Sequence, residues 1–252
     1  MGRSQVNAVY ILWLRAIKRY FRNKSRIIGS LGQPVLFLVA LGFGFGPIYA
    51  KAGGGNYIDF LAPGVIAMSI LFTGIFSGIE IIWDRQFGFL KETLVAPVGR
   101  FNIMLGRTLG GATVAMLQGI FVLILSIIIG FRPNIFQIPL ALVFMFLISI
   151  LFTSLGTAIG CTLSDMQGFQ LIMNFLVQPI FFLSGALFPL TNLPGAISII
   201  TRIDPLTYGV DGLRGALGGI THFGVSVDLL VLTILSGILL GIGSYLFSKV
   251  QI

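Results

Sequence analysis

The side chains that could do chemistry in this chain are few, and they do not assemble a known reactive centre. The single histidine, His222, excludes HExxH and any metal site with two histidine ligands. The single cysteine, Cys161, lies in an apolar stretch, which excludes a disulfide framework and a thiolate metal site. Gly74–Gly78 comes near an intramembrane serine-protease pattern, but its glycine is misplaced. We therefore expect no catalytic residue and no metal site.

Nucleotide-binding motifs are absent as well. The sequence has no GxxxxGK[ST], the loop that cradles phosphates. The alternating Gly42, Gly44 and Gly46 do not match GxGxxG, since residue 47 is proline and the neighbouring residues are apolar. The sequence predicts a chain that is not an enzyme by itself and binds no cofactor.

Two acidic residues lie at the edges of apolar stretches. Glu80 is about one turn from the end of one stretch, and Asp228 begins the last. An acid inside a membrane is a functional candidate, and either residue could be the coupling site of an ion-driven transporter. Their places near span ends argue against this role. Glu80 could instead reach the membrane surface or pair with Arg85.

These residues belong to a chain whose composition is that of a membrane protein. It has 252 residues, of which 56% are hydrophobic and only 10% are charged, whereas soluble domains average about 25% charged residues. Uncharged stretches of 20 residues or more can cross the hydrocarbon layer as helices. The predicted fold is an all-α integral membrane protein, a single domain over 1–252. We place its six spans at 27–50, 60–82, 108–131, 138–163, 169–190 and 225–247.

The Lys and Arg residues are divided unequally between the two predicted sides of the membrane. With both termini in the cytoplasm, the inside segments 1–26, 83–107 and residue 249 hold twelve Lys and Arg. The outside segments hold four: Lys51, Arg132, Arg202 and Arg214. This asymmetry follows the positive-inside rule, so the net charge of +8 does not indicate nucleic-acid binding. We expect a multi-pass protein of the cytoplasmic membrane.

The N-terminal segment, residues 1–26, predicts an amphipathic helix. Val6, Tyr10, Trp13, Ile17 and Phe21 recur at near-helical spacing, and basic residues occupy the other faces. This pattern is typical of a helix that lies in the cytoplasmic membrane interface and contacts lipids. Because a span follows at once, we interpret it as an elbow helix.

The central segment, residues 83–107, is the one long polar interruption between spans. Phe87, Leu90 and Leu94 are spaced i, i+3, i+7, which predicts one apolar face of a short helix that ends at Pro97. Such a helix could dock a cytoplasmic partner, but a plain connecting loop would explain the pattern equally well.

The fifth span is irregular. Asn174 and Gln178 lie four residues apart, Pro179 follows, and Ser184 precedes a glycine. Broken helices are tolerated in membranes only where protein or a water-filled cavity covers the freed backbone groups. These four residues are our candidates for the wall of a translocation pathway; the alternative is a structural kink.

Two short external or re-entrant helices are predicted in 191–222. Asp204 before Pro205 is typical of a helix start. Asp211 and Arg214, three residues apart, could pair on that helix. His222 is expected to be solvated in the loop beyond.

Three segments carry a resemblance to a known family: KETLVAPVGRFNIMLGR (Lys91–Arg107), LSGALFPLTNLP (Leu183–Pro194) and DPLTYGVDGLRGAL (Asp204–Leu217), the last with Tyr208. Together with the elbow and six spans, they make the chain similar to permease subunits of type-2 ABC exporters, in the daunorubicin-resistance and nodulation branch. The resemblance covers nearly the whole chain.

The resemblance implies a second permease copy, a homodimer or a pair with a similar permease, bound to two cytoplasmic ATPase subunits that hold ATP and Mg²⁺. It implies that the coupling helix lies at 85–96. The residues that would contact the ATPase are Arg85, Phe87, Leu90, Lys91, Glu92 and Leu94. No ATPase sequence is fused to this chain, as expected for a half-transporter.

The substrate is less constrained. The neutral pathway candidates and the 23 phenylalanines favour a hydrophobic or amphipathic molecule, such as a drug or a lipid, over a highly charged solute. A lipid-linked glycan is the alternative substrate. Two other classes stay open: an ion-coupled secondary transporter and a membrane scaffold or immunity factor that transports nothing.

Overall fold

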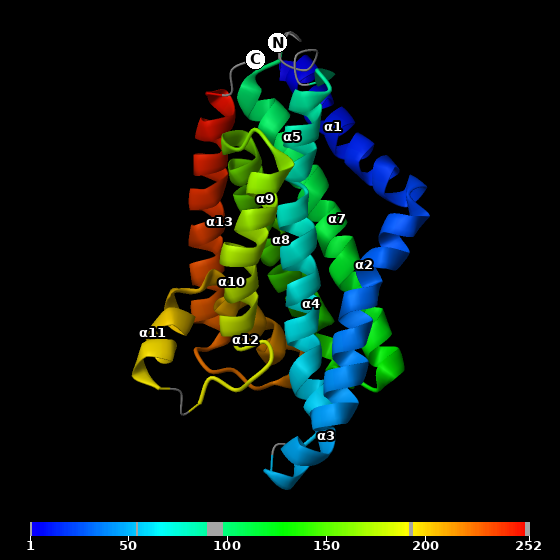
Figure 1. Ribbon diagram of the computed structural model, residues 1–252, viewed down its shortest axis with the longest axis vertical. Helices are drawn as coiled ribbons and strands as arrows, with labels where there is room; N and C mark the ends of the chain where they lie inside the picture. The colour runs from blue at the N-terminus through cyan, green and yellow to red at the C-terminus, as the bar shows by residue number, and fades with distance from the viewer. Residues whose placement is uncertain (1, 54, 90–97, 192–193, 250–252) are drawn as a thin grey trace.

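The computed structural model describes residues 2–53, 55–89, 98–191 and 194–249, and within them every regular element is a helix (Figure 1). The α-helices are α1 (Gly2–Arg22), α2 (Lys24–Leu36), α3 (Gly42–Lys51), α4 (Tyr57–Phe76), α5 (Ile79–Gln86), α7 (Arg100–Ile129), α8 (Ile138–Thr162), α9 (Met166–Ile172), α10 (Gln178–Leu183), α11 (Gly195–Ile203), α12 (Pro205–Gly218) and α13 (Val225–Ser248). Two π-helical turns, η1 (Phe37–Leu41) and η3 (Met173–Val177), and a 3₁₀ turn, η2 (Ile135–Gln137), complete the chain.

Six helical segments of the described chain are long and apolar enough to cross a membrane, as predicted. They are Lys24–Lys51, Tyr57–Gln86, Arg100–Ile129, Ile135–Thr162, Met166–Leu183 and Val225–Ser248. The start of α1 and the end of α13 lie at the same end of the bundle, which we call the termini side (Figure 1). The opposite end, where α3, α11 and α12 lie, is the far side. An even number of spans is consistent with this arrangement.

Two helices differ in length from the predicted spans. The helix that contains the third predicted span, α7, begins at Arg100, so residues 100–107 form two helical turns before Thr108. The helix of the fifth predicted span ends at Leu183, whereas the predicted span continues to residue 190. Gly185 adopts a positive φ of 75°, which ends the helix, and the following residues turn back against α4.

The fifth span is irregular, as predicted, and the irregularity has a local cause. Pro179 has no backbone N–H, so the carbonyl four residues earlier, at Phe175, loses its helical partner. The chain widens into η3 at this position. The first span contains a similar π-helical turn, η1, before the glycine-rich α3.

The core is built around α4, the most buried of the spans. It packs against α7, α8 and α12. At the break between α4 and α5, Gly78 lies so close to α8 that an added Cβ would be 1.9 Å from the carbonyl oxygen of Gly156. Only glycines allow the two backbones to meet here, which fixes where α5 leaves the bundle.

Candidate functional site

The predicted coupling segment leaves the bundle through α5 and returns through α7, at the termini side (Figure 1). Of its six predicted contact residues, Arg85 and Phe87 are described, whereas Leu90, Lys91, Glu92 and Leu94 lie outside the described residues. Phe87 is 73% exposed, and Phe89 and Trp83 beside it are also exposed. The end of α5 therefore presents apolar surface next to the predicted helix.

Arg85 is positioned by α8 rather than held free for a partner. Its guanidinium donates hydrogen bonds to the carbonyl oxygens of Cys161 and Leu163, both at 2.9 Å. Carbonyls at the end of a helix have no partner within the helix, and a cation stabilises them. Arg85 thus joins α5 to the end of α8. The contact of Arg85 with an ATPase stays a prediction. Its side chain already donates to two carbonyl groups within the chain.

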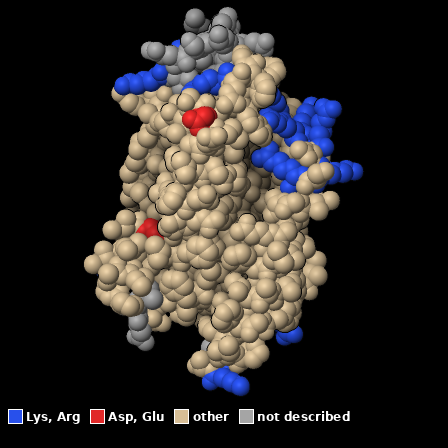
Figure 2. All heavy atoms as spheres, viewed as in Figure 1, with Lys and Arg blue, Asp and Glu red and all other residues tan. Residues whose placement is uncertain are grey.

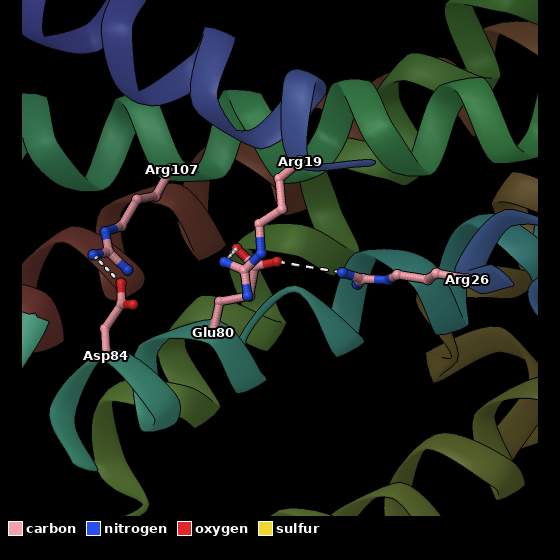
Figure 3. A network of polar contacts seen from close by, with 5 residues as sticks. All are labelled: Arg19, Arg26, Glu80, Asp84 and Arg107. Carbon is pink, nitrogen blue, oxygen red and sulfur yellow. Dashed lines mark hydrogen bonds and ion pairs between the residues drawn. The ribbon is translucent and has the colours of Figure 1, made fainter. Parts of the chain in front are cut away.

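An ion pair joins the two helices from which the coupling segment emerges. Arg107, in the second turn of α7, donates to the carboxylate of Asp84 in α5 (Figure 3). Both side chains are nearly buried, with exposed fractions of 13% and 10%. The pair spans the whole segment in sequence, so it holds the two ends of the segment at a fixed spacing.

A second acid in α5 joins the elbow helix to the same region. Glu80 lies between Arg19 of α1, at 3.3 Å, and Arg26 of α2, at 3.5 Å (Figure 3). The expected alternative of a pair with Arg85 is wrong, because Arg85 is turned toward α8. We call these five residues, Arg19, Arg26, Glu80, Asp84 and Arg107, the termini-side network.

The elbow helix is held against α7 by close packing and three side-chain hydrogen bonds. Asn102 Nδ2 of α7 donates to Gln5 Oε1 of α1 at 2.9 Å. Trp13 Nε1 donates to Thr113 Oγ1 at 3.0 Å, and Tyr20 Oη donates to Gln118 Oε1 at 2.7 Å. An added Cβ at Gly110 would lie 2.7 Å from the Cβ of Ala16, so only a glycine allows the two helices to pack this closely. These contacts tie α1 to α7 along much of its length.

A small cavity of about 50 Å³ lies inside this arrangement. Its wall includes Arg19, Glu80, Asp84 and Arg107 of the termini-side network, together with Thr157 of α8. The described residues contain no cluster of three or more His, Cys, Asp or Glu that could hold a metal. The geometry is that of a mechanical junction in which charged side chains tie four helices together.

The candidate pathway residues of the fifth span separate into two groups. Asn174 and Pro179 are exposed and Gln178 is half-buried, on a face that also exposes Leu171 and Phe175. Ser184 is fully buried. Its hydroxyl donates to the carbonyl of Phe181 and accepts the N–H of Ala186, so it closes the end of α10. The structure does not bring all four residues to one surface.

The predicted helices of the far side are present as α11 and α12. Asp204 begins α12, where its carboxylate accepts the N–H of Leu206 at 2.9 Å and Pro205 follows. Burial raises the pKa of Asp204 to about 7, and the hydrogen bond from Leu206 opposes this shift. The Tyr208 hydroxyl donates to the carbonyl of Arg202 and closes the turn between the two helices.

Asp211 and Arg214 do not form the predicted ion pair. Asp211 instead accepts the backbone N–H groups of His222 and Phe223, each at 2.8 Å. Arg214 donates to the carbonyl of Gly185 at 3.0 Å, and its guanidinium lies 3.9 Å from the ring centre of Phe60. Burial lowers the pKa of Arg214 to about 10, opposed by the charge of Asp211. His222 is exposed, as predicted.

Asp228, in the first turn of α13, is fully buried and lies against Asp211. No described residue donates a hydrogen bond to its carboxylate oxygens. We call Asp204, Asp211, Arg214 and Asp228 the far-side cluster. Sequence reasoning missed the contact between the two carboxyl groups, and it also missed the Asp84–Arg107 pair. In the second case a signal was present: opposite charges near the two ends of one polar segment.

Comparison with known proteins gives a consistent result. The model of the ABC-2 type transporter family matches residues 7–217. The chain is 29% identical over 210 residues to nodulation protein J of Rhizobium meliloti (strain 1021), covering 82% of this chain and 80% of that protein. It is 27% identical over 217 residues to the putative transport permease ycf38 of Cyanophora paradoxa, covering 83% and 73%. Nodulation protein J of Rhizobium leguminosarum bv. viciae is 28% identical over 226 residues, with 87% of each chain covered.

Proposed function

The chain belongs to the ABC-2 type transporter family, and we propose that it is the permease subunit of an exporter driven by separate ATPase subunits. In this proposal the permease works as a dimer, binds no cofactor, and leaves ATP and Mg²⁺ to its partners. The termini side faces the cytoplasm, since the segments predicted there carry twelve of the 16 Lys and Arg. The substrate is hydrophobic or amphipathic.

The observation that supports this proposal most is the way the central segment is anchored. It emerges from α5 and returns to α7, and the Asp84–Arg107 pair ties these helices where the segment leaves them. A force applied to the segment therefore reaches two spans at once. Glu80 extends the connection to α1 and α2, so four helices respond to a movement at one point.

The exposed aromatic side chains at the end of α5 support docking of a partner at this segment. Phe87 is 73% exposed, and Trp83 and Phe89, close to it in sequence, are also exposed. Aromatic residues are enriched at the energetic centres of protein interfaces. Aromatic side chains are also enriched at the membrane–water interface, so a binding experiment has to distinguish docking from membrane contact.

The experiment is reconstitution of the full chain with candidate ATPase subunits, followed by measurement of complex formation and ATP turnover. We compare wild type with Phe87→Asp and with Leu90→Asp/Leu94→Asp. Phe136→Asp is the matched control, since Phe136 is 95% exposed and lies in η2 on the far side. We expect binding to weaken at least tenfold in the coupling-segment variants and to stay unchanged in the control.

Unchanged binding and turnover in all variants, with the permease still folded, would contradict this proposal. The segment would then be an interfacial connector. Gel filtration and circular dichroism of each variant show whether the fold is retained, so a loss of binding cannot be confused with unfolding.

One observation favours a second candidate, an ion-coupled transporter. Asp228 is fully buried at the start of a span, beside Asp211, and no described residue donates to it. Buried acids of this kind carry protons or cations in many transporters. Glu80 does not fit this role, because two arginines neutralise it. Transport that continues after ATP depletion and stops in Asp228→Asn would favour the ion-coupled mechanism.

A further inference from the structure

A groove of about 910 Å³ lies where the elbow helix meets the first span. Its walls come from the last three turns of α1 and the first residues of α2. They consist of Ile11, Leu14, Arg15, Lys18, Arg19, Arg22, Asn23, Lys24 and Ser25. Figure 2 shows Lys and Arg side chains gathered over α1 and its junction with α2. The junction groove is distinct from the cavity of about 50 Å³, although Arg15 and Arg19 line both.

The basic residues around the junction groove differ in how their charge is neutralised. Arg19 and Arg26 turn toward Glu80 and form ion pairs with it (Figure 3). Four other cations are exposed, and no described acid lies within ion-pair distance of any of them: Arg15, Lys18, Arg22 and Lys24. Four like charges close together repel one another unless an anion joins them. The chain therefore leaves room for an anion from outside.

The surroundings of the junction groove indicate the source of that anion. Tyr10, Ile11 and Phe21 of α1 and Ile28 of α2 are exposed apolar side chains, with fractions between 49% and 71%. They flank the cations at the point where an amphipathic helix passes into a membrane span. Apolar side chains of such a helix enter the boundary of the lipid acyl chains. The Lys and Arg side chains beside them then lie at the level of the lipid phosphates.

We propose that the junction groove binds the phosphate headgroup of an anionic phospholipid from the leaflet on the termini side. The headgroup bridges Arg15, Lys18 and Arg22 of α1 to Lys24 of α2, across the bend at Asn23. Asn23 Oδ1 accepts the N–H of Arg26 and shapes this bend. The lipid holds the two helices at the angle at which Arg19 and Arg26 both reach Glu80. The proposal does not depend on the transport function or on any ATPase.

The test uses the full chain purified in an uncharged detergent and titrated with phosphatidylglycerol or phosphatidylcholine. Bound lipid is counted by native mass spectrometry. The groove variant is Lys18→Gln/Arg22→Gln/Lys24→Gln. The matched control, Lys51→Gln/Arg132→Gln/Arg202→Gln, removes the same number of positive charges, three, from exposed side chains on the far side. Glycerol 3-phosphate is added as a soluble phosphate ester without acyl chains.

Each Lys or Arg near an anionic surface contributes about fivefold to binding, so three of them contribute up to about 100-fold. We expect phosphatidylglycerol to bind wild type and the control equally, and to bind the groove variant at least tenfold more weakly. Added salt reduces the difference, since these charges are exposed. Phosphatidylcholine binds all three proteins equally, and millimolar glycerol 3-phosphate does not displace the lipid.

Equal retention of phosphatidylglycerol by the groove variant and the control would overturn the proposal. So would displacement of the lipid by millimolar glycerol 3-phosphate, because the groove would then be a site for a free phosphate ester rather than for a lipid. Equal loss in both variants would also overturn it, since net charge rather than the junction groove would then be responsible. Helicity and gel-filtration profiles identical to wild type establish that each variant is folded.

Discussion

The termini-side network and the far-side cluster both place charged side chains inside a largely apolar bundle, but they neutralise them differently. On the termini side, acids and arginines from different helices pair with one another: Glu80 with Arg19 and Arg26, and Asp84 with Arg107. On the far side, the described charges are held mainly by backbone groups. Asp204 and Asp211 accept N–H groups, and Arg214 donates to carbonyls.

This difference has a mechanical consequence. A pair of side chains from two helices breaks and re-forms when the helices move, and partly exposed pairs contribute little free energy. A side chain bonded to backbone groups of a turn fixes the local chain path instead. The termini-side network is therefore suited to transmit movement between helices, and the far-side cluster is suited to keep α11, α12 and the turn before α13 in place.

The largest expected effect comes from breaking the most buried side-chain pair. Arg107→Met leaves the carboxylate of Asp84 nearly buried without its partner, which costs about 3 kcal/mol of unfolding free energy. Chemical unfolding in detergent micelles, followed by circular dichroism, measures the loss. The double variant Asp84→Asn/Arg107→Met recovers most of it, because no uncompensated charge remains. A single variant as stable as wild type would show that the pair is not the tie we describe.

The second effect is a pH dependence of stability that comes from Asp204 on the far side. The folded pKa of Asp204, about 7, lies above the unfolded value of about 3.9. Between these values the folded chain binds more protons than the unfolded chain, so the free energy of unfolding falls as pH rises. Between pH 5 and pH 8 the free energy of unfolding of wild type is expected to fall by about 2 kcal/mol more than that of Asp204→Asn, because asparagine does not titrate.

Asp204→Ala distinguishes the charge of this residue from its role as a helix cap. Alanine removes the acceptor for Leu206 as well as the titrating carboxyl, so we expect Asp204→Ala to be about 1 kcal/mol less stable than Asp204→Asn at every pH. Thermal unfolding at pH 5, 6, 7 and 8 measures both variants. If wild type and Asp204→Asn follow the same pH profile, Asp204 does not carry this dependence.

The smallest effect on stability is expected where the pairs are most exposed. Glu80→Gln removes two ion pairs, but Arg19 and Arg26 are 40% and 35% exposed, so the loss is about 0.5 kcal/mol. The difference from wild type shrinks in 0.5 M salt, because screening weakens the wild-type pairs. A loss above 2 kcal/mol would mean that Glu80 behaves like Asp84, and the contrast within the termini-side network would disappear.

Several features of this protein followed from the sequence because they depend on local composition. Uncharged stretches located the six spans, since a membrane helix needs about 20 apolar residues. The helical spacing of aromatic and aliphatic residues from Val6 to Phe21 predicted α1, and Asp204 before Pro205 predicted the start of α12. The irregularity of the fifth span followed from Pro179, whose missing donor acts within one turn of its own helix.

The tertiary structure alone decided which side chains meet. Glu80 pairs with residues 61 and 54 positions away, and Arg85 turns to carbonyls of α8. Asp211 and Arg214 share a helix with favourable spacing, yet each takes its partners from other segments. Such contacts depend on the register and rotation of packed helices, which are set by close approaches such as Gly78 against Gly156. Composition and spacing along one helix do not contain that information, because it arises only when the helices pack.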